Sequence, residues 1–214
     1  MLKRIVRKHL GRCHLKINQR NRKRLLNKTP TLVCSNCIGG FLYHWLGLQF
    51  RSPFINLYMT DKDFLIAMEN WDSFWKTEIK EVTNSEYNYP LGEGYQGVKI
   101  HFMHYQSFDE AKSAWDRRKI RINTNNMVVI LANYEGDPDI LQRFDMLPFK
   151  NKIVFVDEPT SEKSAIYLKK YKIFKKKCNK RNKISNIFLT QNYITGKRFI
   201  DQFDYVDYLN KMLY

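Results

Sequence analysis

Hydrophobic residues in this chain gather in short continuous runs, separated by longer segments in which they recur every three or four positions. A short apolar run predicts a strand, because a strand that is covered on both faces is apolar throughout. The run 127–132 (Met-Val-Val-Ile-Leu-Ala) has the pattern of a central strand in such a sheet. The strands predicted by composition are 31–34, 54–59, 98–105, 127–132, 152–156 and 184–190.

The segments between these runs have the spacing of helices that bury one face. Thr60, Ser107 and Asp137 each precede such a segment, and their side-chain oxygens suit the N-cap position. Residues 84–97 contain one proline and three glycines and are predicted to form a loop. The predicted helices lie within 1–28 and at 41–48, 60–75, 107–122, 137–147, 164–170 and 195–213.

Strands and helices that alternate with short connections are typical of an α/β protein. We therefore predict a Rossmann-like layered fold, with a mostly parallel sheet flanked by helices. The 214 residues are enough to bury a full core without disulfides or metals. We divide the chain into a basic N-terminal segment, 1–28, and an α/β domain, 29–214, which includes a lysine-rich segment at 163–183.

The net charge of +16 is concentrated in two segments. Residues 1–28 hold eleven Lys and Arg, residues 163–183 hold ten, and neither segment contains an acid. The rest of the chain contains the remaining 16 basic residues and all 21 acids, which gives it a net charge of −5. Nucleic-acid-binding domains spread basic residues over a packed face among stacking aromatics, so nucleic acid is not the expected partner.

The basic segment 1–28 has two open interpretations. Its apolar residues, among them Leu2, Ile5 and Leu10, recur with helical spacing, and many of its basic residues lie elsewhere around the helix. A basic amphipathic helix of this kind can lie on an anionic membrane surface or dock on a partner. The alternative is a helix that packs on the protein's own core.

Cysteine usage and hydropathy bear on the compartment. The cysteines at 13, 34, 37 and 178 are too few and too unevenly spaced for a disulfide scaffold, which fits a reducing cytoplasm. No run of about 18 apolar residues exists to span a bilayer, and the N-terminus lacks the apolar stretch of a secretory signal. We expect a cytoplasmic protein that reaches the cell membrane only peripherally, at its inner face.

Residues 35–40 follow the first predicted strand and precede a helix, an arrangement found at ligand sites of α/β sheets. Glycine in such a turn lets backbone N–H groups approach a phosphate or carboxylate, although a tight turn that packs helix on strand is the alternative. Cys34 and Cys37 have the spacing of half a zinc site or a redox dithiol, but no second pair exists. We therefore predict no metal and no cofactor. The candidate ligand-binding residues are Ser35, Asn36, Cys37, Gly39, Gly40 and, in the following helix, His44.

Asp61 and Asp63 follow the second predicted strand. They resemble the aspartate pair with which many nucleotide-sugar glycosyltransferases hold a divalent metal through a diphosphate. A threonine at position 60 followed by acids is also an ordinary start of a helix, and we favour this second interpretation.

His101 and His104 are the candidate catalytic residues, because an imidazole can accept a proton from a hydroxyl near neutral pH. In a strand over 98–105, their separation of three places them on opposite faces. They therefore cannot jointly bind one ion without a bulge between them.

Arg118, Arg121 and Asn123 form a cationic cluster at the end of a predicted helix. The two arginines share a helix face, which suits binding of a phosphate or a carboxylated sugar. The structural alternatives are pairing with Asp116 or Glu110 and interaction with the helix dipole.

Several motifs across residues 30–157 resemble DUF1919, a bacterial family of unknown function whose members are described as exopolysaccharide or capsule biosynthesis proteins. The motifs are at 35–40, 43–48, 52–58, 89–92, 100–105, 114–118 and 121–123. The resemblance implies a surface-polysaccharide context without an established reaction. It directs attention to the candidate residues named above as groups that can meet at one cleft, but it does not include Asp61 and Asp63.

The expected function is that of a transferase of exopolysaccharide or capsular polysaccharide biosynthesis, acting on an activated sugar or a sugar-lipid acceptor. The donor is an activated sugar or acyl group whose phosphates are expected near 36–40, assisted by Arg118 or Arg121, with His101 or His104 as general base. The alternative is a non-catalytic binding or scaffold protein of the polysaccharide machinery. Whether the protein is catalytic at all is open at this point.

Overall fold

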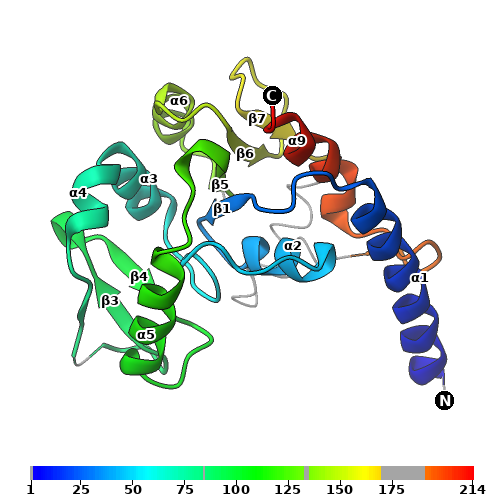
Figure 1. The fold of residues 1–214 in the computed structure, drawn as a ribbon, viewed down its shortest axis with the longest axis horizontal. Coiled ribbons are helices and arrows are strands. Elements are labelled where there is room, and N and C mark those ends of the chain that lie inside the picture. The colour runs from blue at the N-terminus through cyan, green and yellow to red at the C-terminus, as the bar shows by residue number, and fades with distance from the viewer. Residues whose placement is uncertain (1, 84, 133–134, 170–190) are drawn as a thin grey trace.

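The computed structural model describes residues 2–83, 85–132, 135–169 and 191–214 (Figure 1). Its centre is a four-stranded sheet in which all neighbouring strands are parallel, in the order β1-β5-β6-β7. These strands are β1 (Thr31–Cys34), β5 (Met127–Leu131), β6 (Lys152–Val156) and β7 (Ala165–Tyr167). The predicted α/β fold with a parallel sheet flanked by helices is confirmed.

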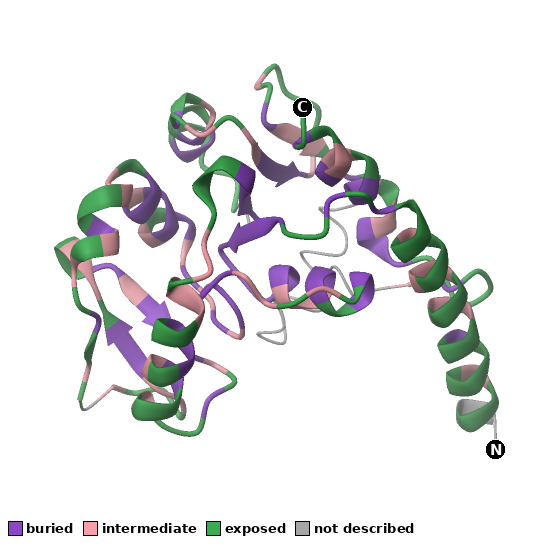
Figure 2. Ribbon diagram, in the orientation of Figure 1, coloured by how far each residue is buried: buried purple, intermediate pink, exposed green. Residues whose placement is uncertain are grey.

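Both faces of the sheet are buried (Figure 2). Alternate side chains of a strand point to opposite faces, so Val129 and Leu131 join one core cluster while Val128 and Ile130 join another. Every residue of β1 and β5 is buried. The continuous apolar runs in the sequence follow directly from this two-sided burial.

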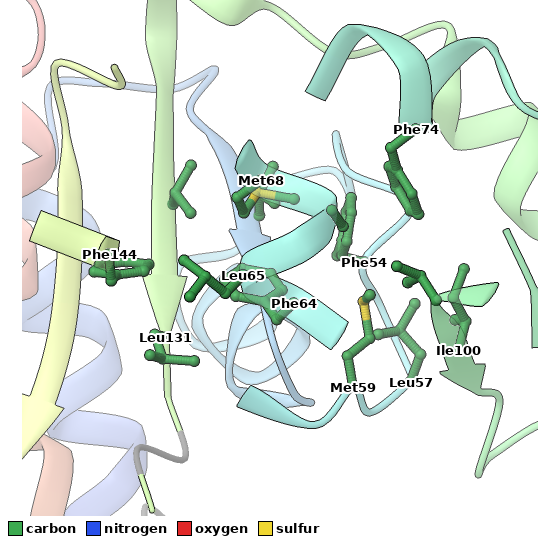
Figure 3. Close-up of a cluster of buried hydrophobic side chains, with 14 of the residues drawn as sticks. Phe54, Leu57, Met59, Phe64, Leu65, Met68, Phe74, Ile100, Leu131 and Phe144 are labelled. Carbon is green, nitrogen blue, oxygen red and sulfur yellow. The ribbon is translucent and has the colours of Figure 1, made fainter. Parts of the chain in front are cut away.

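Helices cover the two faces separately. The first cluster is covered by α3 (Asp61–Glu69), α4 (Trp71–Lys76), α5 (Phe108–Lys119) and α6 (Pro138–Met146). Figure 3 shows part of this cluster, in which Leu65 and Phe64 lie between Leu131 and Phe54. The second cluster is covered by α2 (Ile38–Leu46) and α9 (Tyr205–Lys211).

A small antiparallel sheet lies beside the main one. It consists of β2 (Lys80–Glu81), β3 (Leu91–Glu93) and β4 (Lys99–His101), with a 3-10 turn, η1 (Tyr95–Gly97), between β3 and β4. The prediction of one strand over 98–105 and a loop over 84–97 was therefore wrong in detail. Strands of two or three residues are too short to show an alternating pattern in the sequence.

Other predicted elements also differ. Residues 54–59 form no strand: Asn56 has a left-handed φ of 63°, and Tyr58 alone makes an isolated bridge, to His101. The helix predicted over 60–75 is interrupted at Asn70, and 164–170 contains β7 where a helix was predicted. The C-terminal segment divides into η3 (Phe199–Gln202) and α9. The predicted strand at 184–190 lies outside the described residues.

The basic N-terminal segment forms α1 (Leu2–Arg24), which packs on α2 and α9. Asn21 donates a hydrogen bond to the Tyr205 hydroxyl at 2.9 Å, and Arg22 Nε donates to the Trp45 carbonyl at 2.9 Å. Packing on the protein's own core therefore accounts for one face of α1. None of the helices within the described residues combines the length and apolar content that crossing a membrane requires.

Candidate functional site

The carboxyl ends of β1 and β5 are tied together by Ser35. Its hydroxyl accepts a hydrogen bond from the Ala132 backbone N–H at 2.9 Å, and its backbone N–H donates to the Ile130 carbonyl at 3.0 Å. Its own carbonyl accepts from the Met59 N–H at 2.9 Å, which brings residues 57–59 alongside the turn. Ser35 thus organises the edge of the sheet where ligands bind in many α/β proteins.

Asn36 and Cys37 start α2. The Asn36 side-chain oxygen accepts from the Ile38 N–H at 3.0 Å, and the Cys37 thiol donates to the Leu57 carbonyl at 3.6 Å. Burial raises the pKa of the Cys37 thiol to about 11 and that of Cys34 further above its ordinary value. Both thiols are protonated at neutral pH, so neither is an activated nucleophile.

The glycine pair lies in the first turn of α2 and allows close packing. A Cβ at Gly39 would lie 2.8 Å from the Cys34 sulfur, and one at Gly40 would lie 3.4 Å from Ile55 Cγ2. The first distance is too short for a real side chain. Packing of α2 on β1 therefore requires glycine at 39, whether or not this turn also holds a phosphate.

A cluster of aromatic rings surrounds His101, the last residue of β4; we call Tyr58, Tyr87, Tyr89 and His101 the His101 cluster. The three tyrosine ring centroids lie 5.5, 5.0 and 5.9 Å from the imidazole, in that order. His101 Nδ1 is hydrogen-bonded to the Tyr89 hydroxyl at 3.2 Å. Burial lowers the pKa of His101 below its ordinary value, and the Asp63 carboxylate acts in the opposite direction.

Carboxylates lie on one side of the His101 cluster. Burial and the nearby carboxylates of Glu135, Asp61 and Asp63 raise the pKa of the Tyr58 hydroxyl well above its ordinary value. The Asp61 side chain accepts from the Glu135 N–H at 2.6 Å, which joins the start of α3 to the segment that follows β5. The site is therefore acidic where it meets the sheet edge.

The hydrogen bonds between Thr60 and Asp63 confirm that residues 60–63 cap a helix. The Thr60 hydroxyl accepts from the Asp63 N–H at 3.1 Å and donates to the Asp63 carboxylate at 2.6 Å. The other Asp63 oxygen accepts from the Lys99 N–H at 3.2 Å, which links α3 to β4. Across the described part of the chain, no three His, Cys, Asp or Glu side chains are grouped to hold a metal ion.

A surface hollow of about 420 Å³ adjoins the His101 cluster. Tyr87 and Tyr89 belong to both, and Ser107 at the start of α5 lies on the hollow's wall. The remaining lining residues include Glu81, Thr83, Ser85, Asn88 and Gln106. A hollow lined by three aromatic residues, Tyr87, Tyr89 and Phe108, and by many polar groups is suited to a polar ligand with some apolar surface.

The other predicted site residues lie elsewhere. Arg121 Nη1 donates to the Phe50 carbonyl at 3.1 Å, and the Asn123 N–H donates to the hydroxyl of Thr31, the first residue of β1. Both contacts belong to the amino edge of the sheet, whereas the turn at 35–40 belongs to its carboxyl edge. The structure does not bring these two predicted groups to one place.

Arg118, His44 and His104 have separate surroundings. Arg118 Nη1 donates to the Tyr105 hydroxyl at 2.7 Å, and its guanidinium lies over the Phe50 ring. His44 is exposed near the end of α2. His104 is exposed in the turn that follows β4, so the two histidines do not lie on opposite faces of one strand as predicted.

The three tyrosines were not predicted as site residues. Tyr87 and Tyr89 lie in the segment predicted as a loop, and Tyr58 lies at the end of a strand that does not form. A pair of tyrosines two residues apart, beside a proline, was the available signal in the sequence. This tyrosine pair becomes part of a site only because β4 brings His101 against both rings.

The parallel sheet with helices on both faces and a polar cluster at its carboxyl edge defines an α/β protein of the Rossmann-like layered class. The chain belongs to the family described as "Domain of unknown function (DUF1919)", which matches residues 9–210. It is similar to a Haemophilus influenzae (strain ATCC 51907 / DSM 11121 / KW20 / Rd) protein described as "Uncharacterized protein". The two are 38% identical over 197 residues, covering 91% of this chain and 90% of the relative.

Proposed function

We propose that this protein is a transferase of exopolysaccharide or capsule biosynthesis, and that His101 is its general base toward a sugar hydroxyl. The observation that carries the proposal is the buried His101 imidazole, which is hydrogen-bonded to Tyr89, a residue that lines a polar, aromatic hollow. The polysaccharide context is implied by the family resemblance of the sequence motifs. The substrate is an activated sugar together with a sugar or sugar-lipid acceptor.

The surroundings of His101 suit a base. A pKa lowered by burial keeps the imidazole neutral at neutral pH, the form that can accept a proton. In the tautomer in which Nδ1–H donates to the Tyr89 oxygen, Nε2 carries the free lone pair. Nε2 then takes the proton of the acceptor hydroxyl while its oxygen bonds to the donor carbon, and the phosphate leaving group departs with the bonding electrons.

The same site suits a carbohydrate acceptor. Tyr87 is 43% exposed and stacks on Tyr89 with ring centroids 5.1 Å apart, which provides a flat apolar surface for the C–H face of a sugar ring. The carboxylates near Tyr58 can accept hydrogen bonds from sugar hydroxyls. The same negative charge disfavours phosphate at this place, so the proposal assigns the donor's phosphates to the N-terminal turn of α2.

The test is replacement of His101 by glutamine in the native host at normal expression, with His44→Gln and His104→Gln as matched exposed controls. Loss of a general base lowers the rate by about 10²–10⁴-fold, so His101→Gln is expected to abolish the polysaccharide or its modification. Both controls are expected to leave its amount and sugar composition unchanged. Because His101 is buried, Tyr89→Phe serves as a second variant that keeps the ring and removes only the hydroxyl.

Normal polysaccharide from folded His101→Gln and Tyr89→Phe proteins contradicts the catalytic proposal. That result favours a non-catalytic binding or scaffold role, for which there is also a specific observation. Ser35, Asn36 and Gly39 all have packing or backbone-bonding roles in the turn. If the protein only binds, the host strain with Tyr87→Ser is expected to make less polysaccharide, because an exposed ring of the hollow is lost, while the strain with His101→Gln makes a normal amount.

A further inference from the structure

Among the described residues, one face of helix α1 packs on the rest of the fold and the opposite face is exposed. Leu10 is buried, Asn21 bonds to Tyr205, and Arg198 Nη2 donates to the Asn18 side chain at 2.7 Å. The helix lies along one end of the molecule, and its first turns extend beyond the rest of the fold (Figure 1). Most of its length is exposed (Figure 2).

The outward face of α1 is basic and carries two apolar side chains. With 3.6 residues per turn, its members fall within about 100° of the helix circumference, opposite Leu10 and Asn21. All of them are exposed, and residues 1–28 contain no acid to neutralise them. Ile5 and Leu15 are 58% and 56% exposed. The outward face consists of Ile5, Lys8, Arg12, Leu15, Lys16, Gln19 and Lys23.

A loop of the C-terminal region adds to this surface. His9 Nε2 is hydrogen-bonded to the Ile194 carbonyl at 2.9 Å, and a Cβ at Gly196 would lie 2.4 Å from Cys13 Cβ. The loop at residues 193–196 therefore packs closely against α1. Its tip presents Tyr193 and Ile194 to solvent, 70% and 81% exposed.

We infer that the outward face of α1, together with Tyr193 and Ile194, is a docking surface for an anionic membrane. Clustered Lys and Arg are attracted to anionic headgroups, and exposed aliphatic side chains among them can enter the interface. Tyrosine is enriched at the membrane–water boundary. Residues 1–28 contain no Phe, Trp or Tyr, so Tyr193 alone in this surface offers such a ring to a base, whereas a single-strand binding groove uses several, which favours a membrane over a nucleic acid. This inference does not depend on the proposed transferase function.

The experiment is co-sedimentation of the full chain with phosphatidylcholine vesicles that contain or lack phosphatidylglycerol. Wild-type protein is expected to bind only the anionic vesicles, and raising the salt concentration is expected to release it. The variant Lys8→Gln/Arg12→Gln/Lys16→Gln is expected to bind on the order of a hundredfold more weakly, since each basic residue adds to the attraction. Its thermal unfolding checks that the fold is unchanged.

A matched control removes three exposed basic residues from the other end of the molecule. Lys76→Gln/Lys80→Gln/Arg117→Gln alters the same net charge near α4, β2 and α5, which lie far from α1 (Figure 1). It is expected to bind anionic vesicles nearly as wild type does. Equal loss in this control shows that net charge alone drives binding, which overturns the inference.

The apolar anchors are tested separately. Ile5→Ser/Leu15→Ser and Tyr193→Ser/Ile194→Ser are expected to weaken vesicle binding at constant charge, and each is compared with wild type at one salt concentration. Wild-type affinity in both, or in the triple Gln variant, overturns the assignment of this surface. Retention on single-stranded nucleic acid without any vesicle binding also overturns it, in favour of a nucleic-acid partner.

Discussion

At the scale of single residues, two glycines of this chain have opposite surroundings. Gly39 lies where α2 meets β1, and a Cβ at this position would lie 2.8 Å from the Cys34 sulfur, too close for a side chain. Gly11 lies in the exposed middle of α1, where an added Cβ would meet nothing within 4 Å. Glycine is therefore required by close packing at position 39, whereas position 11 has space for a side chain.

These surroundings predict stability changes of opposite sign. Gly39→Ala is expected to lower the free energy of unfolding by about 1–3 kcal/mol, because it overpacks a buried contact. Gly11→Ala is expected to raise it by about 0.5–1 kcal/mol, because alanine favours the helix. Urea unfolding of both variants at neutral pH measures the two differences. Equal effects of the two substitutions argue against the close approach of α2 to β1.

At the scale of elements, the N-terminus of α3, whose cap is recognisable in the sequence, is hydrogen-bonded to the strand that carries His101. Thr60 caps the helix, and the same Asp63 that completes the cap accepts a hydrogen bond from β4 through Lys99. The N-terminus of α3 therefore positions β4 and, with it, His101. A motif that resembles a metal-binding aspartate pair serves here to join a helix to a strand.

This role predicts a measurable cost for losing the cap. Thr60→Ala is expected to destabilise the protein by about 1 kcal/mol, because the Asp63 N–H loses its acceptor. Thr60→Ser keeps the oxygen and is expected to stay within a few tenths of a kcal/mol of wild type. Thermal or urea unfolding compares the three proteins. A Thr60→Ser variant as unstable as Thr60→Ala shows that the threonine methyl group, and not the cap, is responsible.

At the scale of the whole molecule, the parallel sheet separates two groups of polar residues. The His101 cluster and the acids near Tyr58 gather toward its carboxyl edge, while Arg121 and Asn123 contact its amino edge. Basic side chains extend along α1 at one end of the fold. The proposed sugar site and the proposed membrane surface therefore lie on different sides of one fold.

The buried His101 and the partly buried His14 make global stability depend on pH. Burial lowers the pKa of His101 and His14 below the ordinary value of 6.5, and for His14 the Arg198 guanidinium adds to the effect. The unfolded chain then binds more protons than the folded one just below pH 6.5, so stability is full above that pH and falls as the pH drops.

Urea unfolding at pH 8 and pH 5.5 tests this dependence. Wild-type protein is expected to be less stable at pH 5.5. The difference is expected to shrink in His101→Gln, which removes one of the two groups, and to persist in His104→Gln, which changes an exposed side chain. An unchanged difference in His101→Gln shows that this imidazole does not have a lowered pKa in the folded protein.

The sequence by itself determined the elements that depend on near neighbours. Strands 31–34 and 152–156 were predicted with their observed bounds, and the caps at Thr60, Ser107 and Asp137 were recognised, because two-sided burial and N-terminal capping leave local patterns. The parallel α/β class followed from their alternation.

Only the tertiary structure decided which residues meet. The His101 cluster joins side chains from three separate segments, and the neighbouring short strands form through the pairing of β3 with both β2 and β4. Tertiary packing also placed Arg121 and Asn123 away from the turn at 35–40 and left one face of α1 uncovered. Local patterns record whether a residue is buried, but the partner against which it is buried depends on contacts between residues far apart in the chain.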